Sequence, residues 1–561
     1  MTNKKWNILQ TNNVTVSNLA TELNVDEKIS RLLVSRGITN YVDAESFFRP
    51  KLKDIYDPFL MKNMSPAVDR LVLAKSRNDS VLVFGDYDVD GTTSVAMMYL
   101  FLLKQGFNVK YYIPDRYDEG YGISKKGIDF ARNNNINLII ALDCGIRAIE
   151  QVDYASKHNI DFIICDHHNP GKKTPKALAI LNPKQIDCSY PFKELSGCGV
   201  GFKLIHAYAI YKKIALSNIF FFLDLVAISI IADMVPVTGE NRIFSFYGLK
   251  KINTKASIGI QSLINISARN HNIKASDILF GIAPLINAAG RITHAKHAVS
   301  VLIEEDFLKA KEYSEKILVN NTNRKLIEKQ ITIDALKMVN EKKFSNVVFS
   351  SNWHKGVVGI VASRLIESYY KPTIVLSEKN GILTGSARSV KGFDIYEAIN
   401  KCSNLCEKFG GHKYAAGLTI KKENLNQFVE KFEEIVSSSI KPEQLINCID
   451  IDLEIDLEEI DAKFYRILKQ FSPFGPGNKN PLLLSRNVKL DKNPSFIGKD
   501  KTHVKLNFYR ENSSSIDAIG FGFAPIFKTL NNNLLSICYS LDENTWKDVT
   551  RLQMNLRDVL L

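Results

Sequence analysis

Three carboxylates at alternating positions stand at the end of one apolar segment. They are Asp86, Asp88 and Asp90, which follow the apolar residues 81–84 and precede Gly91. An apolar run of this length is typical of a buried strand, and the glycine is compatible with a turn into a helix. Carboxylates this close repel one another unless a cation lies among them. The pattern therefore predicts a divalent metal site at the carboxyl end of a strand.

Two known motifs fit part of the same stretch. A calcium-binding EF-hand loop also begins with alternating acids, but it requires a glutamate at its twelfth position, where this chain has Met97. A haloacid-dehalogenase-type phosphatase begins with a strand and the pattern DxDGT, which residues 88–92 match by themselves. A solvated acidic turn also fits the pattern. This stretch alone therefore leaves a phosphatase, another metal site and an acidic turn open.

Two further apolar segments also end in side chains that bind metal ions. The segment 138–142 leads to Asp143, and the segment 162–165 leads to the adjacent His167 and His168. In an open parallel sheet, ligands bind beyond the carboxyl ends of the strands. We therefore expect the three acidic or histidine-bearing ends to meet in one crevice.

A fourth contribution to this crevice is expected from Asp233, at the end of the apolar segment 225–232. By itself this residue would be interpreted as a helix end, but an acid on an apolar helix is costly to bury unless it is paired or coordinated. Several carboxylates with one or two imidazoles suit two hard cations, Mn²⁺ or Mg²⁺. Two such ions activate water for phosphoester hydrolysis, which is the predicted reaction class.

The elements that position these residues alternate between strand and helix. A helix is predicted at 92–105 and a strand at 109–113, between the segments named above, so the fold class is α/β with a mostly parallel sheet. Residues 307–343 contain no glycine or proline and predict one long helix between two lobes. A second α/β unit is predicted from strands at 347–349, 373–376 and 382–384, and a small barrel from strands at 504–508, 515–519 and 534–539.

Composition narrows the class of protein further. The 561 residues are 45% hydrophobic and carry a formal charge of +13, which favours a polyanionic partner, with nucleic acid ahead of an anionic membrane surface. The most apolar stretch, 219–237, is interrupted by Asp224 and Asp233, so we expect a buried helix and no membrane span. No apolar segment follows the first residues, and the eight cysteines show no zinc-binding spacing. We expect a cytoplasmic protein with reduced cysteines.

The order of three motifs resembles the DHH phosphoesterase superfamily. The motifs are DVDG at 88–91, LDCG at 142–145 and DHH at 166–168. The DHH triplet counts against a haloacid-dehalogenase-type enzyme, which also requires a catalytic lysine and a later acidic pair. Within the superfamily the chain resembles the RecJ family of single-stranded-DNA-specific exonucleases over nearly its whole length, at residues 57–60, 85–93, 114–116, 119–122, 232–236, 287–291, 353–364, 385–389, 410–417 and 473–477.

The resemblance implies five consecutive parts, in agreement with the pattern along the chain. They are an N-terminal helical cap on the first domain (1–78), a DHH catalytic domain (79–305), a connecting helix (306–343), a DHH-associated nucleic-acid-binding domain (344–448) and a C-terminal OB-fold β-barrel (449–561).

The resemblance also implies roles for the residues of the crevice. The residues expected to bind two Mn²⁺ or Mg²⁺ ions are Asp88, Asp90, Asp143, His167 and Asp233, with Asp86 as a further ligand or a support for the ligands. Asp143 and His167 would thereby take part in catalysis. His168 is expected to contact the scissile phosphate.

Phosphates of the substrate are expected to bind at glycine-flanked turns. By motif these residues are Arg116, Arg291, Ser386, Arg388, Gly411 and His412. Arginine donates two hydrogen bonds to one phosphate, although a surface salt bridge is the other interpretation for each arginine. One departure from the family is Ala387, where glycine is more usual, so the loop at 385–389 is expected to be slightly altered.

Aromatic residues elsewhere are expected to extend the binding track for a single strand. In the barrel the residues considered are His503, Lys505, Phe508 and Tyr509, since OB-folds stack bases on aromatic side chains in a basic groove. Trp353 fits either base stacking or burial at a domain interface.

The leading hypothesis is an exonuclease that removes 5′-mononucleotides stepwise from the 5′ end of single-stranded DNA, in recombination and repair. Its expected partners are single-stranded DNA, a single-strand-binding protein and a RecQ-like helicase, with no membrane. An alternative enzyme is a DHH-type phosphodiesterase or pyrophosphatase acting on short oligonucleotides, cyclic dinucleotides or pyrophosphate. A non-enzymatic alternative is a nucleic-acid-binding scaffold that has lost its metal ligands, whereas here the predicted ligand set is complete.

Overall fold

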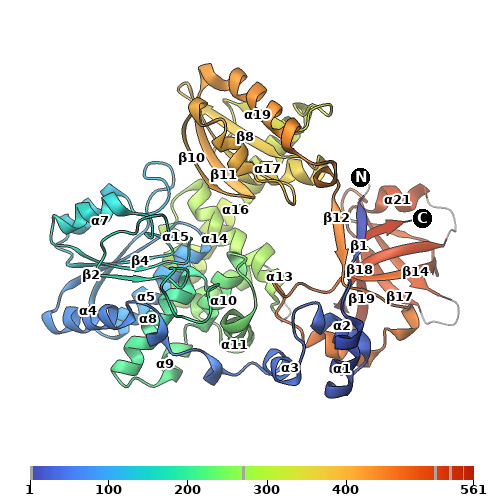
Figure 1. Cartoon of the computed structure of the whole chain (residues 1–561), viewed down its shortest axis with the longest axis horizontal. Helices are drawn as coiled ribbons and strands as arrows, with labels where there is room; N and C mark the ends of the chain where they lie inside the picture. The colour runs from blue at the N-terminus through green and yellow to red at the C-terminus, as the bar shows by residue number, and fades with distance from the viewer. Residues whose placement is uncertain (1–3, 268–271, 511–514, 530–533, 547–548, 561) are drawn as a thin grey trace. The chain divides into compact units, whose positions relative to one another are not determined.

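The computed structural model describes residues 4–267, 272–510, 515–529, 534–546 and 549–560 (Figure 1). The chain forms two compact units. One comprises Arg49–Ile327 with Pro473–Lys479 and is called here the parallel-sheet unit. The other comprises the described residues up to Phe48, Glu328–Ser472 and those from Asn480 onward, and is called here the mixed-sheet unit. Each is described by itself.

The parallel-sheet unit contains a five-stranded sheet in the order β3-β2-β4-β5-β6, with every neighbouring pair parallel. Its strands are β2 (Ser80–Gly85), β3 (Asn108–Tyr112), β4 (Leu138–Leu142), β5 (Asp161–Cys165) and β6 (Ala179–Leu181). The first four lie where the apolar runs predicted them, and the predicted α/β class with a parallel sheet is confirmed. The short edge strand β6 was not predicted.

Helices cover both faces of this sheet, which explains why its strands are apolar without alternation. Leu82 and Phe84 of β2 pack in one cluster with residues of α6 (Lys125–Asn133) and α7 (Ile149–Ser156). Val81 and Val83 point to the other face, in a cluster with residues of α4 (Met64–Arg77), α5 (Val89–Lys104) and α8 (Gly197–Tyr211). In Figure 1 the ribbons of α7 and of α4, α5 and α8 lie on opposite sides of β2 and β4.

The rest of the parallel-sheet unit is helical. Its further elements are η1 (Leu52–Asp54), η2 (Pro58–Leu60), α9 (Leu216–Phe220), α10 (Leu223–Ala232), α11 (Gly239–Lys255), α12 (Ile258–Ile266), α13 (Ala275–Asp277), η3 (Ile278–Ile282), α14 (Ala283–Ile292) and α15 (Lys296–Ile303). The buried Asp224 in α10 pairs with Lys251 of α11, which offsets its burial. Within the described ranges, no helix has both the length and the apolar character that crossing a membrane requires.

The predicted long helix is α16 (Phe307–Lys337), which ends six residues before the predicted boundary at 343. The residues that follow it form turns instead, and the backbone N–H of Lys342 donates to the side chain of Asn340. Short local hydrogen bonds of this kind compete with helix continuation. The division between the two units falls within α16, after Ile327.

The mixed-sheet unit begins its second α/β part with a five-stranded sheet in the order β10-β11-β9-β8-β7. Only β7 and β8 are parallel, and the other neighbours are antiparallel. The elements are β7 (Asn346–Ser350), α17 (Val358–Ser368), β8 (Thr373–Lys379), β9 (Ile382–Arg388), α18 (Ile395–Asn400), η4 (Ser403–Leu405), β10 (Cys406–His412), β11 (Ala415–Lys421), η5 (Lys422–Asn424), α19 (Leu425–Ser439) and η6 (Pro442–Leu445).

One expectation about a loop in this part is wrong. The stretch 385–389 is not a turn, because its first four residues complete β9. The stretch 410–417 lies mostly in the hairpin of β10 and β11. Ala387 is buried, lies in extended backbone paired with Ala416, and does not have a positive φ. Alanine therefore fits this position without the strain expected from its replacement of glycine.

The C-terminal part is the predicted barrel. Seven strands follow the order β13-β14-β18-β19-β17-β16-β15, and an additional pairing of β14 with β16 connects distant members of the sheet. The elements are β13 (Leu453–Glu454), η7 (Leu457–Glu459), α20 (Ala462–Lys469), β14 (Leu483–Leu490), β15 (Ser495–Ile497), β16 (His503–Tyr509), β17 (Ile516–Gly520), α21 (Ala524–Thr529), β18 (Leu535–Trp546) and β19 (Val549–Leu560). The predicted fold class of this part is confirmed.

The predicted cap, 1–78, is divided between the two units. Residues from Arg49 onward, including α4, belong to the parallel-sheet unit as expected, whereas the described residues up to Phe48 belong to the mixed-sheet unit. The latter are helical, in α1 (Asn13–Leu23), α2 (Glu27–Val34) and α3 (Tyr41–Phe48). They follow an unpredicted strand, β1 (Lys5–Ile8), which pairs in parallel with β12 (Cys448–Ile451). The indole of Trp6 donates to Asp558 at 2.8 Å. These contacts span most of the chain, so local sequence patterns do not reveal them.

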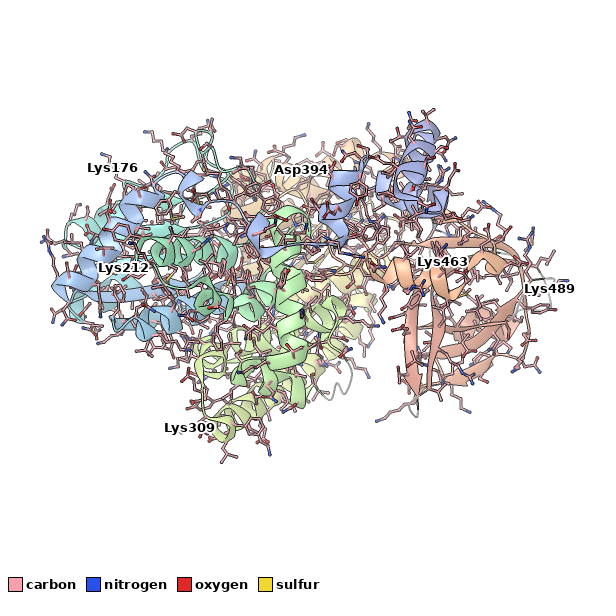
Figure 2. All side chains as sticks on the ribbon, turned by 90° about the horizontal axis from the view of Figure 1, so that it is seen from below. Lys176, Lys212, Lys309, Asp394, Lys463 and Lys489 are labelled. Carbon is pink, nitrogen blue, oxygen red and sulfur yellow. The ribbon has the colours of Figure 1, made fainter. Side chains whose placement is uncertain are left out.

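The positive charge is spread over the surface. The exposed Lys176, Lys212 and Lys309 of the parallel-sheet unit and Lys463 of the mixed-sheet unit project outward, as Figure 2 shows. All eight cysteines are free thiols, as the absence of paired spacing predicted.

Candidate metal centre

The acidic and histidine side chains predicted from the strand ends do come together. Because β2, β4 and β5 are neighbours, the residues that follow them share one edge of the sheet. Three groups have ligand atoms within 4.8 Å of one another, namely Asp86, Asp88 and Asp143; Asp90, His167 and Asp233; and Asp143, His167 and His168. All six predicted ligands are therefore found in one cluster, which also includes His168.

Asp90 is held by the amino end of α8. Its carboxylate accepts hydrogen bonds from the backbone N–H groups of Gly197 at 2.7 Å and Cys198 at 2.8 Å. The hydroxyl of Ser229 in α10 donates to the same carboxylate at 2.6 Å. These three donors, two of them at the positive end of the helix dipole, hold the carboxylate of Asp90 in a fixed, buried position.

Asp86 and Asp88 lie on either side of the turn from β2 into α5. Asp88 is the N-cap of α5 and accepts from the backbone N–H of Gly91 at 3.0 Å. A Cβ atom at Gly91 would lie 2.3 Å from the carbonyl oxygen of Asp86, so only glycine fits this turn. Burial and the neighbouring Asp88 raise the pKa of Asp86 well above its usual value. Backbone hydrogen bonds within the turn and the charge of Arg116 offset this rise only in part, so a bound cation would stabilise the turn further.

Asp143 lies at the centre of the cluster and has an unusual backbone. Its φ of 59° is in the left-handed region, which is uncommon for a residue other than glycine. Gly197 packs directly against it, because a Cβ atom at Gly197 would lie 2.6 Å from the Cβ of Asp143. Burial, followed by the charges of Asp90 and Asp88, raises the pKa of Asp143 well above its usual value. The strained backbone directs this acid into the cluster.

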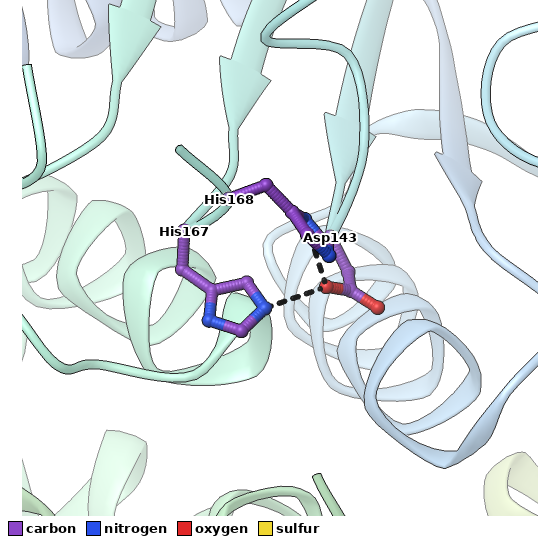
Figure 3. Close-up of side chains that lie close together, drawn as sticks. All are labelled: Asp143, His167 and His168. Atoms are coloured by element: carbon purple, nitrogen blue, oxygen red, sulfur yellow. Dashed lines mark ion pairs between the residues drawn. The ribbon is translucent and has the colours of Figure 1, made fainter. Parts of the chain in front are cut away.

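His167 bridges the acids from the β5 side. Its Nε2 atom lies 3.2 Å from Asp143 Oδ1, 3.6 Å from Asp233 Oδ2 and 3.8 Å from Asp90 Oδ2, and Figure 3 shows the first of these contacts. Burial lowers the pKa of His167, which favours the neutral imidazole that binds metals. Asp233, which contributes one of these contacts, is the C-cap residue of α10 and stays 27% exposed.

His168 is oriented by Asp166, whose role was not predicted separately from the triplet. Asp166 Oδ1 lies 2.7 Å from His168 Nδ1, and the backbone N–H groups of His167 and Ile146 donate to the same carboxylate. Although burial opposes it, hydrogen bonding with His168 lowers the pKa of Asp166 to about 2. The imidazole of His168 is 45% exposed, and Figure 3 shows it beside Asp143, at 4.0 Å. An exposed ring held in this way can meet a substrate.

The donor set fits divalent cations. Buried polar atoms normally have hydrogen-bond partners, yet Asp86 Oδ1, Asp143 Oδ1 and both ring nitrogens of His167 have none. These atoms belong to the groups that approach one another within 4.8 Å. Carboxylate oxygens with one imidazole suit Mn²⁺ or Mg²⁺. Asp143 is common to two of the three groups, which suits two ions that share a ligand.

Two of the predicted phosphate-binding residues lie beside this cluster. The guanidinium of Arg116 stacks on Tyr87 at 4.7 Å from the ring centre, and Tyr87 stands between the ligands Asp86 and Asp88. The backbone carbonyl of Arg291 accepts from Tyr117, one residue after Arg116. Burial comes first among the causes that raise the pKa of Tyr87 to about 12, and both arginines oppose it. Both cations therefore lie close enough to act on the acidic turn.

Four further predicted residues lie in the other unit. Ser386 and Arg388 are in β9, where the guanidinium donates to the Ser386 hydroxyl at 2.7 Å. Gly411 and His412 end β10, and Gly411 has a φ of 141°. A Cβ atom at Gly411 would lie 2.4 Å from the carbonyl oxygen of Ala415, so the hairpin explains this glycine without a ligand. Their binding role remains a prediction.

The structure shows which of the aromatic residues considered for base stacking are buried and which are exposed. Trp353 and Phe508 are buried, and the Phe508 ring packs near Phe527, so neither presents a free face. Phe521, which was not predicted, is 62% exposed and contacts the ring of His503 at 5.3 Å between centres. In the sequence, the glycines on either side of it, 520 and 522, are the feature that could have indicated this exposed position.

Sequence reasoning also missed Tyr121 and the amino end of α8. The Tyr121 hydroxyl donates to the carbonyl of Asp143 at 3.2 Å and lies 3.2 Å from His168 Nε2. The local signal for α8 is Ser196 followed by glycines at 197 and 199, which is typical of a capped helix that approaches other backbone closely.

Comparisons with known proteins agree with this geometry. The DHH family N-terminal domain matches residues 80–230, the DHHA1 domain matches 340–438 and the RecJ OB domain matches 451–558. The single-stranded-DNA-specific exonuclease RecJ of Bacillus subtilis is 36% identical over 561 residues, covering 99% of this chain and 70% of that protein. The protein of the same name from Haemophilus influenzae is 31% identical, covering 94% and 95% of the two chains.

Two solved structures have a fold similar to that of this chain. RecJ from Thermus thermophilus in complex with Mn²⁺ superposes with a TM-score of 0.86 at 23% identity, covering 99% of this chain and 79% of that one. An exonuclease RecJ bound to manganese has a TM-score of 0.61 at 28% identity, covering 69% and 97%.

Proposed function

Because the chain belongs to the RecJ family of single-stranded-DNA-specific exonucleases, we propose that it removes 5′-mononucleotides from the 5′ end of single-stranded DNA by two-metal hydrolysis. The observation that carries this function is the convergence of six ligands, from three strand ends and α10, in one buried cluster with unpartnered donor atoms. A scaffold without catalysis would have no need of so costly an arrangement of buried charges.

The residues proposed to hold two Mn²⁺ or Mg²⁺ ions are Asp86, Asp88, Asp90, Asp143, His167 and Asp233. Relatives support both ions, since structures of RecJ from Thermus thermophilus are described with Mn²⁺ and with Mg²⁺. When bound, such ions activate water and stabilise charge on phosphate oxygens. The amino end of α8 holds the carboxylate of Asp90 in place, and Asp143, whose backbone is left-handed, belongs to two of the three groups of ligand atoms.

His168 is proposed to bind the scissile phosphate. Although burial lowers it, the hydrogen bond with Asp166 raises the pKa of His168, so the imidazolium is favoured beside the acids. Asp166 and the Tyr121 hydroxyl hold the ring from its two nitrogens. A cationic ring fixed in this way can stabilise the negative charge of a nearby phosphate oxygen.

The 5′-terminal phosphate is proposed to bind Arg116 and Arg291 of the parallel-sheet unit. Phosphates of the substrate are also proposed to bind residues of the mixed-sheet unit, namely Ser386, Arg388, Gly411 and His412. The position of Arg116 beside Tyr87 supports its part. In the OB-fold, His503, Lys505, Tyr509 and Phe521 are proposed to carry the rest of the strand. A single-strand-binding protein and a RecQ-like helicase are the proposed partners, because an enzyme that acts on single strands needs those strands to be unpaired and accessible. We place the protein in the cytoplasm, with the chromosomal DNA on which it would act.

A single-stranded oligonucleotide labelled at its 5′ end tests the reaction. With Mn²⁺ or Mg²⁺ we expect labelled mononucleotide from the single strand and almost none from blunt duplex. Asp143→Ala should abolish release while leaving binding of the strand intact, and Asp153→Ala, a change at an exposed acid in α7, should have no effect. Equal digestion of duplex, or no mononucleotide release, contradicts this function. Faster turnover of a dinucleotide than of a long strand would favour the small-substrate phosphodiesterase instead.

A further inference from the structure

A hollow of about 570 Å³ lies beyond the carboxyl end of β6, outside the metal centre. Its lining includes Asn169, Lys184, Ile186, Lys193 and Glu194, all within the parallel-sheet unit. The segment after β6 therefore forms a depression whose walls are mostly polar. No residue lining it was predicted to have a function.

The hollow adjoins the histidine pair. Asn169, which lines it, follows His168 directly in the chain. The side chain of Asn182 connects the two features, because it donates to the carbonyl of His168 at 2.9 Å and accepts from the backbone N–H of Lys184 at 2.8 Å. The segment that carries Lys184 is thus fixed to the same backbone that presents His168 to a substrate.

The ammonium of Lys184 is the cation in this hollow that can change partners. Its side chain is only 22% exposed, and it forms an ion pair at 3.5 Å with Glu194, whose side chain is 44% exposed. Lys193 differs, because its ammonium donates to the carbonyl of Cys188 at 2.6 Å. A largely buried ammonium facing a half-exposed carboxylate at this distance is weakly paired. An anion of higher charge density can displace that carboxylate.

The order of the strands places this hollow opposite the arginine that is proposed to bind the 5′ phosphate. Arg116 follows the edge strand β3, the metal ligands follow β2, β4 and β5, and Lys184 follows the other edge strand, β6. A DNA strand whose 5′ end lies at Arg116 and whose scissile phosphate lies over the ligands would next reach β6. Successive phosphates of a single strand would thus meet Arg116, the metal centre and Lys184 in turn.

We propose that the hollow binds the phosphate immediately 3′ of the scissile phosphodiester, with Lys184 as the residue that binds it. The phosphate replaces Glu194 as the partner of the ammonium. Ile186, which is fully exposed at the wall of the hollow, packs against the adjoining sugar. Lys184 thereby helps to place the next phosphodiester for the following cycle, which would favour successive cleavage of one strand.

Substrates of different length isolate this phosphate, since the role rests on the exonuclease activity proposed above. A 5′-phosphorylated dinucleotide has only the terminal and scissile phosphates, whereas a trinucleotide adds the phosphate assigned to Lys184. For the unmodified enzyme we expect a lower KM for the trinucleotide. Lys184→Gln should raise that KM by about tenfold and leave the dinucleotide KM unchanged, as expected for loss of a charged hydrogen bond.

Three further variants serve as controls. Lys176→Gln removes the same charge from an exposed position shortly before β6, where Figure 2 shows it projecting outward, and should change neither KM. Lys184→Arg should retain the advantage of the trinucleotide. Glu194→Gln should lower the trinucleotide KM, because it removes the competing carboxylate, and it keeps the question answerable if Lys184→Gln fails to fold.

Two results would overturn the role of Lys184. One is an equal effect of Lys184→Gln on both substrates, which would mean that the lysine serves the metal centre alone. The other is no effect of either Lys184→Gln or Glu194→Gln on the trinucleotide. Failure of the unmodified enzyme to release nucleotides from any strand is a different result, because it would refute the exonuclease itself and the subsite with it.

Discussion

At the scale of single residues, the metal centre is a set of charges that the chain leaves uncompensated. Asp86, Asp143 and Asp233 each have a pKa raised by burial first and by neighbouring acids second. Asp90 differs, because α8 supplies its hydrogen bonds. The site therefore combines one acid that hydrogen bonds from the protein stabilise with others whose charge a bound cation would neutralise. Such a division favours strong binding of divalent ions over a stable empty site.

This division predicts how Mn²⁺ stabilises the protein at different pH. In the metal-free protein the raised pKa values mean that protonated acids favour folding, and this contribution is lost as the pH rises through the folded pKa. Mn²⁺ replaces those protons. We therefore expect a larger rise in Tm on adding Mn²⁺ at about pH 8 than at about pH 5, measured after removal of metals with a chelator.

The acid at the centre of the cluster provides the control for this measurement. Asp143→Asn should reduce the rise in Tm at the higher pH, because it removes a charge that faces the ions. An equal rise in Tm at both pH values in the unmodified protein would show that the acids are already ionised and balanced without metal.

At the scale of secondary structure elements, α8 acts as a support for two ligands. Its first two backbone N–H groups hold Asp90, and its first residue, Gly197, touches Asp143. The helix is held in turn by a buried ion pair between Lys203 and Glu240 of α11. Breaking such a pair by removing one partner typically costs about 3 to 5 kcal/mol. The position of α8 is therefore well defined.

Substitution of Gly197 tests this support. Gly197→Ala would place a Cβ atom 2.6 Å from the Cβ of Asp143, so either α8 or the ligand must move. We expect the rate of nucleotide release to fall about a hundredfold with little loss of folded protein, since small misplacements of catalytic groups have effects of that size.

The same helix offers a matched control. Gly199→Ala meets only ordinary contacts, the nearest at 3.4 Å, and should retain activity. Circular dichroism would show that both variants are folded. Full activity of the Gly197 variant would mean that the contact with Asp143 has no catalytic importance.

At the scale of the whole molecule, the chain supplies a reaction centre in one unit and a barrel in the other. The formal charge of +13 provides general attraction for a polyanion. It does not by itself select a single strand. Stacking of unpaired bases on exposed aromatic rings can do so, and within the described residues of the barrel Phe521 is the large aromatic side chain most open to solvent.

Phe521 should therefore affect long substrates and not short ones. Phe521→Ala is expected to weaken binding of a long single strand by about 1 to 3 kcal/mol, the usual contribution of one stacked base, as measured by fluorescence anisotropy. Turnover of a 5′-phosphorylated dinucleotide should be unchanged. Val549→Ala, at an exposed apolar position in the same barrel, serves as the comparison. If the affinity of the Phe521 variant for the long strand were unaltered, Phe521 would not be part of the proposed binding track for the single strand.

The sequence by itself indicated which side chains are the proposed metal ligands and which elements carry them. Apolar strands with no alternation must be buried on both faces, and parallel strands present their carboxyl ends together. The residues after β2, β4 and β5 could therefore be expected to meet, as they do. The same local reasoning identified α16 and three of the seven described strands of the barrel, because their periodicity or turn residues are visible within a short window.

Only the tertiary structure decided which distant segments support those ligands. The amides that hold Asp90 come from residues 107 and 108 positions later in the chain, and β1 finds its partner in β12. The depression around Lys184 likewise depends on how the segment after β6 folds back beside His168. Hydrogen bonds between remote segments depend on packing, and packing leaves no periodic signal in the sequence. For this reason the chemistry of the site was visible in the residues, whereas its support and its further subsite were not.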